Sequence, residues 1–399
     1  MSDAVLSSAE ESSQDYHIRV HDDPRGIECA AWNSLLAQQA EPTVFMRHEY
    51  LSALHESGSA TARTGWAPRF VTLELQGHLR AAAALYLKAH SYGEYVFDWS
   101  WAEAYRRHGQ RYYPKLLAGV PFTPVAGTRL LATSAVWRER LVAQMQAFAV
   151  QSKLSSAHLI FGDAVDREAL SRAGWMLRHG VQFHWQAAAE RPTTSFDEFL
   201  ASLQRDKRKK IQQERRRVAE QGVTFSAHRG AEITEPLWDF FHRCYTLTYQ
   251  AHHSSPYLTR EFFAAMALTM SEHWLLFAAH RAGRPLGCSL IALDPARRIA
   301  YGRYWGATEF VPCLHFEACY YQPLAWCMAN GYRRFEGGAQ GEHKMARGLL
   351  PVRTGSAHWL ADPRFAGAVA DFLGAEGSHI DGYVDELSER NPFKADSAP

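Results

Sequence analysis

The sequence predicts an α+β fold that is repeated along the chain, and two observations support this prediction. Each half contains three strand-like tracts in succession, followed by an apolar helical tract and one more short strand. The turns between the tracts contain glycine where a tight antiparallel connection needs a positive φ. A meander flanked by helices is an α+β arrangement, and two copies of about 150 residues fit the 399-residue chain.

In the first half, the meander is expected within residues 69–101. The order is a strand, a tight turn at QGH, a second strand, a loop and a third strand in the aromatic tract that ends at Trp101. The apolar tract 136–154 predicts a helix, and residues 157–164 are expected to follow it as a short strand.

The second half repeats this order. Residues 274–307 predict a meander with turns at RAGR and DPARR, followed by a helix over 315–331 and a short strand over 332–338. A strand at 223–229 and helices at 235–250 and 259–271 precede this meander. Within the first of these two helices, three aromatic residues recur at helical spacing and are expected in the core. They are Trp238, Phe241 and Tyr245.

The composition is typical of a soluble globular protein, with 47% hydrophobic and 21% charged residues. The net charge of +1 excludes a global field that attracts nucleic acid or membrane, so such a partner needs a local patch. The acidic, polar N-terminus lacks the features of a signal peptide, and no apolar run is long enough to span a bilayer. The six cysteines and twenty histidines show no metal-binding spacing, which predicts reduced thiols, a cytoplasmic protein and no metal site.

A basic helix is predicted between the halves. Ser195 and Glu198 form a capping-box pattern at its start, and Gly222 is expected to end it. Residues 204–210 include no apolar residue over nearly two turns, and eight Lys or Arg residues between 205 and 217 face only two acidic residues. This helix is interpreted either as an exposed linker or as a binding helix for the phosphates of a cofactor, a tRNA acceptor end or anionic lipids. The absence of aromatic residues argues against reading of single-stranded bases.

The stretch EGGAQGEHKMARG, residues 336–348, combines glycines with acidic, basic and imidazole groups. It is interpreted as the lining of a functional site, and the alternative is an ordinary loop. Glu342 and His343 are candidate general acid/base residues, whereas Lys344 and Arg347 are candidates for holding phosphate or carboxylate.

Several blocks of the sequence resemble the FemAB-like bacterial proteins, which are classed as predicted N-acyltransferases and are related to the peptidoglycan-bridge Fem ligases. The resemblance runs from about residue 40 to residue 380. Its blocks include YLKAHSYGEYVFDWSWAEAY, RYYPKLLAGVPFTPVAGTRLL, DKRKKIQQERR, GRYWGA, LHFEACYYQ and EGGAQGEHKMARGLLPVRT.

This resemblance implies two tandem GNAT-like halves, each an antiparallel meander flanked by helices. The expected domains are 16–190 and 223–390, joined by the basic helix 191–222, with a disordered N-terminal tail at 1–15 and a C-terminal tail at 391–399. The implied activity is N-acyl transfer from a phosphate-bearing donor to an amine. Acyl-CoA is the favoured donor and aminoacyl-tRNA the second candidate, with no tightly bound cofactor. The sequence departs from the usual glycine-rich CoA loop, because the Q/R-x-x-G-x-G/A spacing is missing between Tyr304 and His315.

Residues for this chemistry follow from the resemblance and the local sequence. Glu317, in an apolar helix, is a candidate base or a first-turn helix residue, and Tyr304 is a candidate acid or a packing residue. Donor phosphates are assigned to the cations Lys207, Lys209, Lys210, Arg303, Lys344 and Arg347. Recognition of the acceptor is assigned to the polar-aromatic residues Tyr92, Glu94, Asp98 and Trp99, which are equally consistent with a half-buried strand. The alternative function is a non-catalytic binder that docks on RNA or anionic membrane through the basic helix.

Overall fold

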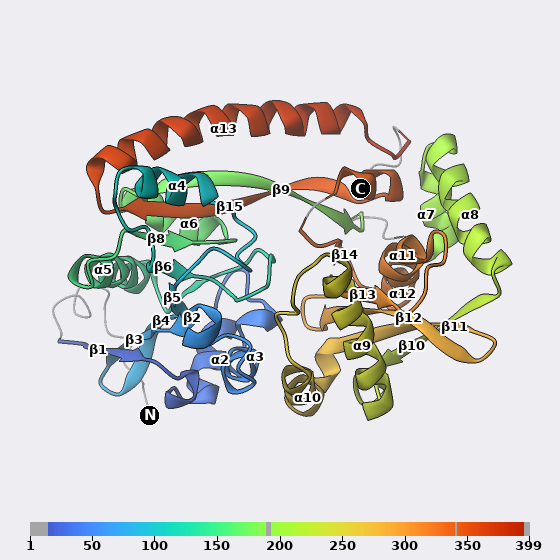
Figure 1. Cartoon of the computed structure of the whole chain (residues 1–399), viewed down its shortest axis with the longest axis horizontal. Helices are drawn as coiled ribbons and strands as arrows, with labels where there is room; N and C mark the ends of the chain where they lie inside the picture. The colour runs from blue at the N-terminus through green and yellow to red at the C-terminus, as the bar shows by residue number, and fades with distance from the viewer. Residues whose placement is uncertain (1–14, 189–192, 340, 395–399) are drawn as a thin grey trace, which may run out of the picture. The chain divides into compact units, whose positions relative to one another are not determined.

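The computed structural model describes residues 15–188, 193–339 and 341–394. The chain divides into two compact units, one made of Met1–Gly180 and Thr354–His379 and the other of Val181–Arg353 and Ile380–Pro399. Each unit contains both strands and helices, so the predicted α+β class is confirmed (Figure 1). Within the described residues, no helix is long and apolar enough to cross a membrane.

The first unit contains two groups of paired strands. One is a four-stranded antiparallel sheet in the order β1 (His17–His21), β3 (Phe70–Leu75), β4 (His78–Ala83) and β7 (Leu130–Ala132). The other follows the order β2 (Trp66–Pro68), β5 (Leu85–Lys88), β6 (Lys115–Ala118), β8 (Ser156–Leu159) and β15 (Leu350–Leu360). Strands β6 and β8 are parallel, and the predicted helix α5 (Ala135–Gln151) lies between them in the sequence.

Helices cover these strands in the first unit. They are α2 (Cys29–Ala37), α3 (His48–Glu56), α4 (Trp99–Arg107), α5 and α6 (Ala164–Arg172). Buried side chains of α5, among them Trp137, Leu141 and Met145, pack in one cluster with β3, β4, β6 and β8. Residues 354–379 belong to this unit because β15 pairs with β8 and because Val369 and Leu373 pack with α4, which the predicted domain boundaries did not include.

The prediction of a third strand in the aromatic tract that ends at Trp101 is wrong. Residues 90–98 form an irregular loop and α4 starts at Trp99. The chain leaves the strand conformation because Trp101 and Tyr105, one helical turn apart, are both buried in the cluster with α13 (Pro363–Glu389). The strand that pairs with β5 is instead β6.

The second unit is built on a meander in the order β10 (Val223–Arg229), β11 (Trp274–Arg281), β12 (Arg284–Asp294) and β13 (Ile299–Ala307), all antiparallel. The parallel strand β14 (Arg334–Glu336) adds to β13, and residues 184–186 of β9 (Met176–Gln186) pair with β14. Helices α9 (Glu235–Ala251) and α10 (Arg260–Thr269) lie between β10 and β11 in the sequence. Between β13 and β14 come α11 (Leu314–Phe316), a π-helical turn (Glu317–Tyr321) and α12 (Gln322–Ala329), and a 3-10 helix (Glu342–Arg347) follows β14.

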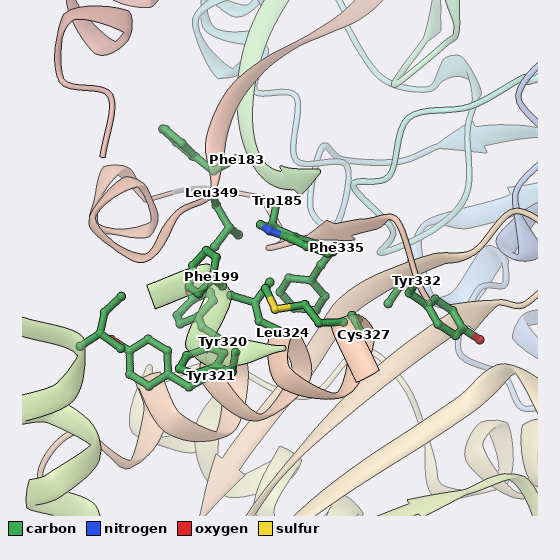
Figure 2. Packing of buried hydrophobic residues seen from close by; sticks show 14 of the residues in the cluster. Phe183, Trp185, Phe199, Tyr320, Tyr321, Leu324, Cys327, Tyr332, Phe335 and Leu349 are labelled. Carbon is green, nitrogen blue, oxygen red and sulfur yellow. The ribbon is translucent and has the colours of Figure 1, made fainter. Parts of the chain in front are cut away.

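In both units, an antiparallel meander is followed by a helix and then by a strand that pairs in parallel with the sheet. The predicted fold of two tandem GNAT-like halves, each an antiparallel meander flanked by helices, is therefore confirmed. The core of the second unit includes Phe199, Tyr321 and Phe335 around α12 and β14 (Figure 2). The predicted core residues Trp238, Phe241 and Tyr245 are buried on α9.

Close packing of α9 on the meander depends on a glycine in β13. A Cβ on Gly306 would collide with the backbone carbonyl of Cys244, which lies on α9. A single buried methyl group at this position would therefore force the helix away from the sheet.

The basic segment forms two helices and not the single helix that the sequence predicted. Ser195 caps the start of α7 (Phe196–Ser202), as expected, by accepting a hydrogen bond from the backbone amide of Glu198, and α8 (Arg205–Glu220) follows. The break at Leu203 arises because this buried residue bridges to Phe393, while the Gln204 amide donates to the carbonyl of Pro392. Residues 391–394 of the predicted C-terminal tail are thus docked on the second unit, and residues 395–399 lie outside the described part.

Candidate functional site

The second unit contains a cavity where two parallel strands separate. Strands β13 and β14 pair through residues 299–301 and 334–336, and Gly302 and Gly337 follow these paired segments. A Cβ on Gly302 would lie 3.2 Å from the ring of Phe335, so glycine permits the close approach of the two strands. The cavity beyond has a volume of about 220 Å³. It is lined by Ser289, Ile291, Gly302, Arg303, Tyr304, Trp305, His315, Cys319, Tyr320, Gly337, Gly338 and Ala339.

A β-bulge in β13 brings an arginine to this cavity. Leu290 of β12 faces Tyr304, but Ile291 faces Gly302, so Arg303 is one extra residue in β13. A bulge of this kind bends a strand and redirects a side chain. The Arg303 guanidinium donates a 3.0 Å hydrogen bond to the Tyr304 hydroxyl.

A second cavity, of about 320 Å³, lies against the same stretch of β13. Arg303, Tyr304 and Trp305 line both cavities and therefore form a shared wall. The rest of the lining comes from α9 and the residues after it: Tyr245, Thr248, Tyr249, His252 and Ser254. The Thr248 hydroxyl donates to the carbonyl of Trp305 at 2.9 Å, which fixes α9 against β13.

The π-helical turn brings an imidazole and a phenol into the first cavity. His315 and Tyr320 are five residues apart, and their ring centroids are 5.7 Å apart. Ordinary α-helical spacing would have placed His315 beside Cys319, four residues further along the chain. Burial, with the nearby His343, Arg347 and Lys344, lowers the pKa of His315 to about 4. His315 is therefore a neutral imidazole at pH 7, which is the state that accepts a proton.

Tyr320 connects this wall to a predicted catalytic histidine. The Tyr320 hydroxyl lies 3.3 Å from Nε2 of His343, which is exposed to solvent. Burial raises the pKa of Tyr320 far above its ordinary value, so the phenol stays protonated. Burial and the cations Arg347, Lys344 and Lys210 lower the pKa of His343, against the opposite effect of Glu214. The pair is thus a protonated phenol backed by an imidazole that solvent can reach.

Two of the predicted catalytic carboxylates lie elsewhere. Glu317 is buried, with its oxygens 3.2 Å from Nε of Arg215 and 2.7 Å from Nε2 of Gln322, and burial outweighs these partners and raises its pKa. Glu342 is exposed and accepts a 2.8 Å hydrogen bond from Tyr383. Among the predicted catalytic residues, the structure therefore brings together Tyr304, in the lining, and His343, behind Tyr320.

Of the predicted phosphate-binding cations, one lies in the cavity lining and the others lie outside it. Arg303 lines the cavity. Lys344 is buried behind the lining loop, where its ammonium donates to the Gly338 carbonyl at 3.1 Å and burial lowers its pKa to about 8. Arg347 is 2% exposed, pairs with Glu214 at 2.8 Å and lies 3.5 Å from the centroid of the Phe316 ring. The lysines of α8 do not belong to the lining of either cavity: Lys207, Lys209 and Lys210.

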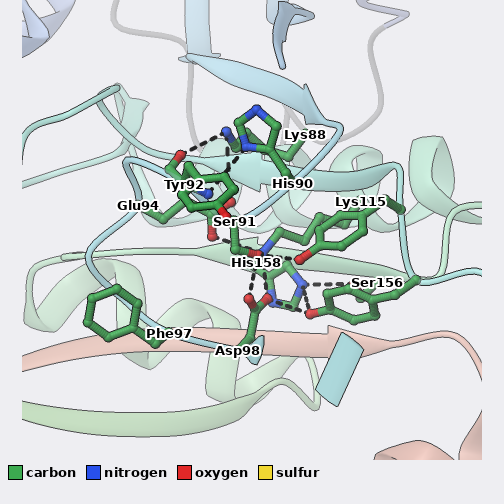
Figure 3. A network of polar contacts seen from close by, with 12 residues as sticks. Lys88, His90, Ser91, Tyr92, Glu94, Phe97, Asp98, Lys115, Ser156 and His158 are labelled. Atoms are coloured by element: carbon green, nitrogen blue, oxygen red, sulfur yellow. Dashed lines mark hydrogen bonds and ion pairs between the residues drawn. The ribbon is translucent and has the colours of Figure 1, made fainter. Parts of the chain in front are cut away.

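The four residues assigned to acceptor recognition all lie in the first unit. Glu94 and Asp98 are buried and converge on the ammonium of Lys115, 2.8 Å from Glu94 (Figure 3). Burial raises the pKa of Glu94 to about 7, although Lys115 opposes this effect. Tyr92 and Trp99 are 59% and 41% exposed, with ring centroids 4.9 Å apart. The two carboxylates are therefore internal ion-pair partners, and the two aromatic rings are available at the surface.

Sequence reasoning missed His315 and Tyr320 as candidate catalytic residues. Both stand in the block LHFEACYYQ, but in a regular α-helix residues five apart would point to different faces. The π-helical turn places the two side chains next to each other. Within residues 15–188, 193–339 and 341–394, no group of three His, Cys, Asp or Glu residues is placed to hold a metal ion.

A family model with the description "peptidoglycan biosynthesis/recognition" matches residues 24–395. No curated protein sequence matches the chain. Several solved structures do match along nearly their whole length.

One such structure is FemX, which is 12% identical, with 90% of this chain and 100% of that chain covered and a TM-score of 0.53. A second is L-PGS from Bacillus licheniformis, at 9% identity, 90% and 99% coverage and a TM-score of 0.54. A third is the C-terminal domain of a putative lysylphosphatidylglycerol synthetase from Agrobacterium fabrum, at 11% identity, 88% and 95% coverage and a TM-score of 0.52. These likenesses concern the fold.

Proposed function

The chain belongs to the FemAB-like family, and from this premise we propose that the protein transfers an acyl group from a phosphate-bearing donor to an amine in the cavity between β13 and β14. One observation supports the proposal above the others. A neutral imidazole, a protonated phenol and a bulged arginine meet in a cavity between two separating parallel strands. These are the groups that direct acyl transfer requires: a base, an acid and a positive charge.

In the proposed reaction, the amine nitrogen attacks the carbonyl carbon of the donor's thioester or ester, and His315 accepts the proton that the amine loses. The tetrahedral intermediate then expels the leaving sulfur or oxygen, which takes a proton from Tyr320. His343 contacts Tyr320 and solvent, so the phenol regains its proton through it while His315 releases one. The proton balance closes without a covalent enzyme intermediate.

The two cavities suggest two subsites on either side of Arg303. We place the donor's acyl group in the cavity of about 220 Å³ beside His315, and the acceptor in the cavity of about 320 Å³ beside Tyr249 and His252. The family description makes an amine of a peptidoglycan peptide the first acceptor to test. Acyl-CoA is the preferred donor. Aminoacyl-tRNA is the second candidate because the loop before α11 lacks the glycine spacing of a CoA-binding loop.

Donor binding is the first test of the proposal. We expect acetyl-CoA or a longer acyl-CoA, present at about 100 times its Kd, to stabilise the protein by roughly 2.7 kcal/mol in a thermal unfolding assay. Replacing Ala339 by tryptophan places an indole in the cavity lining and is expected to remove most of this stabilisation. The exposed Ala361, replaced in the same way, serves as the matched control.

The outcomes separate the candidates. If the protein binds aminoacyl-tRNA but no acyl-CoA, and the Ala339→Trp variant loses this binding, the donor is aminoacyl-tRNA. Acyl-CoA binding that is equal in both variants would place the ligand outside this cavity. If neither donor stabilises the protein, the acyltransferase proposal fails.

A further inference from the structure

Helix α8 carries a cationic surface that the proposed reaction does not use. Two of its eight basic side chains have acidic partners: Lys207 with Asp206 at 2.9 Å and Arg215 with Glu317 at 3.2 Å. Within the described part of the chain, the other six make no ion pair. They are Arg205, Arg208, Lys209, Lys210, Arg216 and Arg217. In a protein of net charge +1, this is a concentrated positive patch.

The way α8 packs directs this charge outward. Ile211, Glu214 and Val218 form its buried stripe, and Lys209, Lys210, Arg216 and Arg217 are exposed on the remaining surface. In Figure 1, α8 lies at the edge of the second unit, with one side free of other elements of that unit. A solvated helix face normally mixes charges of both signs, because like charges one turn apart repel.

An apolar feature lies beside the cations. Phe310, in the loop between β13 and α11, is 89% exposed. The next residue, Val311, is buried in one cluster with Val218 of α8 and Val223 of β10, so the loop is fixed against the C-terminal part of the helix. An exposed phenylalanine therefore projects from the segment that packs on the cationic helix.

A groove follows the same helix. Its volume is about 630 Å³, and α8 and β10 supply much of its lining. Val218, Val223 and Phe225 are apolar members of that lining, Arg215 and Arg216 are the basic ones, and Asp197 and Glu317 are acidic. The face thus combines exposed cations, a groove with a mixed apolar and charged lining, and an exposed aromatic ring.

From these features we propose that the face formed by α8, β10 and the loop at Phe310 docks on an anionic phospholipid bilayer. Cations near such a surface attract its lipid headgroups, and an adjacent aromatic side chain enters the headgroup region. Nucleic acid fits the face less well, because base stacking needs successive exposed aromatic rings, whereas here only Phe310 is fully exposed and Phe225 is half-buried. The inference is independent of the proposed transferase activity.

Vesicle flotation of the full chain tests this surface. We expect binding to phosphatidylcholine vesicles that contain roughly 30% phosphatidylglycerol, much weaker binding to pure phosphatidylcholine, and loss of binding between about 0.1 M and roughly 1 M salt. Each basic residue near an anionic surface changes the partition roughly fivefold, so Lys209→Gln/Lys210→Gln should weaken it roughly 25-fold. Phe310→Ala should weaken it by about tenfold.

Matched variants control for charge and apolarity. Arg106→Gln/Arg107→Gln removes the same charge from α4, where both side chains are exposed, and Leu268→Ala removes an 85% exposed side chain from α10. Both controls should bind vesicles as the unaltered protein does.

Equal binding to neutral and anionic vesicles, or equal losses in the controls, would overturn the proposal. Preferential binding of bulk tRNA, weakened by the α8 variant, would reassign the face to nucleic acid. Acyl-CoA titration of the same variants reports separately on the proposed function.

Discussion

Replacing Lys115 by methionine is expected to lower the free energy of unfolding by about 3–5 kcal/mol, because the change leaves buried carboxylates without their main partner. The Lys115 ammonium lies 2.8 Å from Glu94 and contacts Asp98, and all three side chains are at most 4% exposed. Lys88 is 4.0 Å from Glu94 and compensates only part of this charge. Chemical denaturation followed by circular dichroism measures the loss.

A matched control separates burial from charge. Arg172→Met removes an exposed partner of Glu168 and Glu139 and should change the free energy of unfolding by about 1 kcal/mol or less. Adding Glu94→Gln and Asp98→Asn to Lys115→Met should recover part of the loss, since uncharged side chains need no counter-ion. A loss below about 1 kcal/mol for Lys115→Met would show that the buried charges are not coupled as the geometry indicates.

The pH dependence of this deficit has a defined sign. Burial raises the pKa of Asp98, but Lys115, His158 and hydrogen bonds outweigh it and hold the pKa below the ordinary 3.8. A lowered native pKa contributes stability above the ordinary pKa, and this contribution is lost as the pH falls. Without Lys115, burial dominates and the native protein takes up the proton more readily. The deficit of Lys115→Met should therefore be largest near neutral pH and shrink as the pH falls towards about 4.

Replacing His315 by glutamine is expected to lower kcat/KM for acyl transfer about 10²–10⁴-fold, because the variant lacks the group that accepts the amine's proton. KM for the donor should change little, since His315 acts on the amine. The assay is single-turnover acyl transfer with the donor that the thermal assay identifies. His379→Gln, an exposed substitution on α13, is the control. Equal activity of both variants would remove His315 from the mechanism.

The pH profile distinguishes a catalytic from a structural role for His315. Burial and neighbouring cations lower its pKa to about 4, and a base must be unprotonated to act. The kcat/KM of the unaltered protein should therefore rise as the pH increases through about 4. Titration of His315 should cause no further change in kcat/KM near neutral pH. Tyr320→Phe should slow departure of the leaving group while keeping the rise at about pH 4. In His315→Gln the rise itself should disappear.

Much of the fold followed from local patterns in the sequence. The strands of the second meander, the helix over 235–250 and the helix start at Ser195 were all predicted, because apolar spacing, turn glycines and helix caps are signals that depend on a few neighbouring residues. The third strand of the first meander and the single basic helix were predicted wrongly. In both cases distant partners decided the conformation: burial of Trp101 with α13, and pairing of Leu203 with Phe393.

The candidate site shows the same division. The sequence by itself identified the tract that carries His343 and the strand that carries Arg303 and Tyr304, since polar and charged residues there interrupt apolar elements. It did not determine which of these groups meet. That depended on one extra residue in β13 and on a π-helical turn that sets His315 beside Tyr320. It also depended on Glu214, which turns Arg347 inward and away from solvent. The sequence specifies the chemical groups, and only tertiary packing fixes the register and burial that bring some of them together in the candidate site.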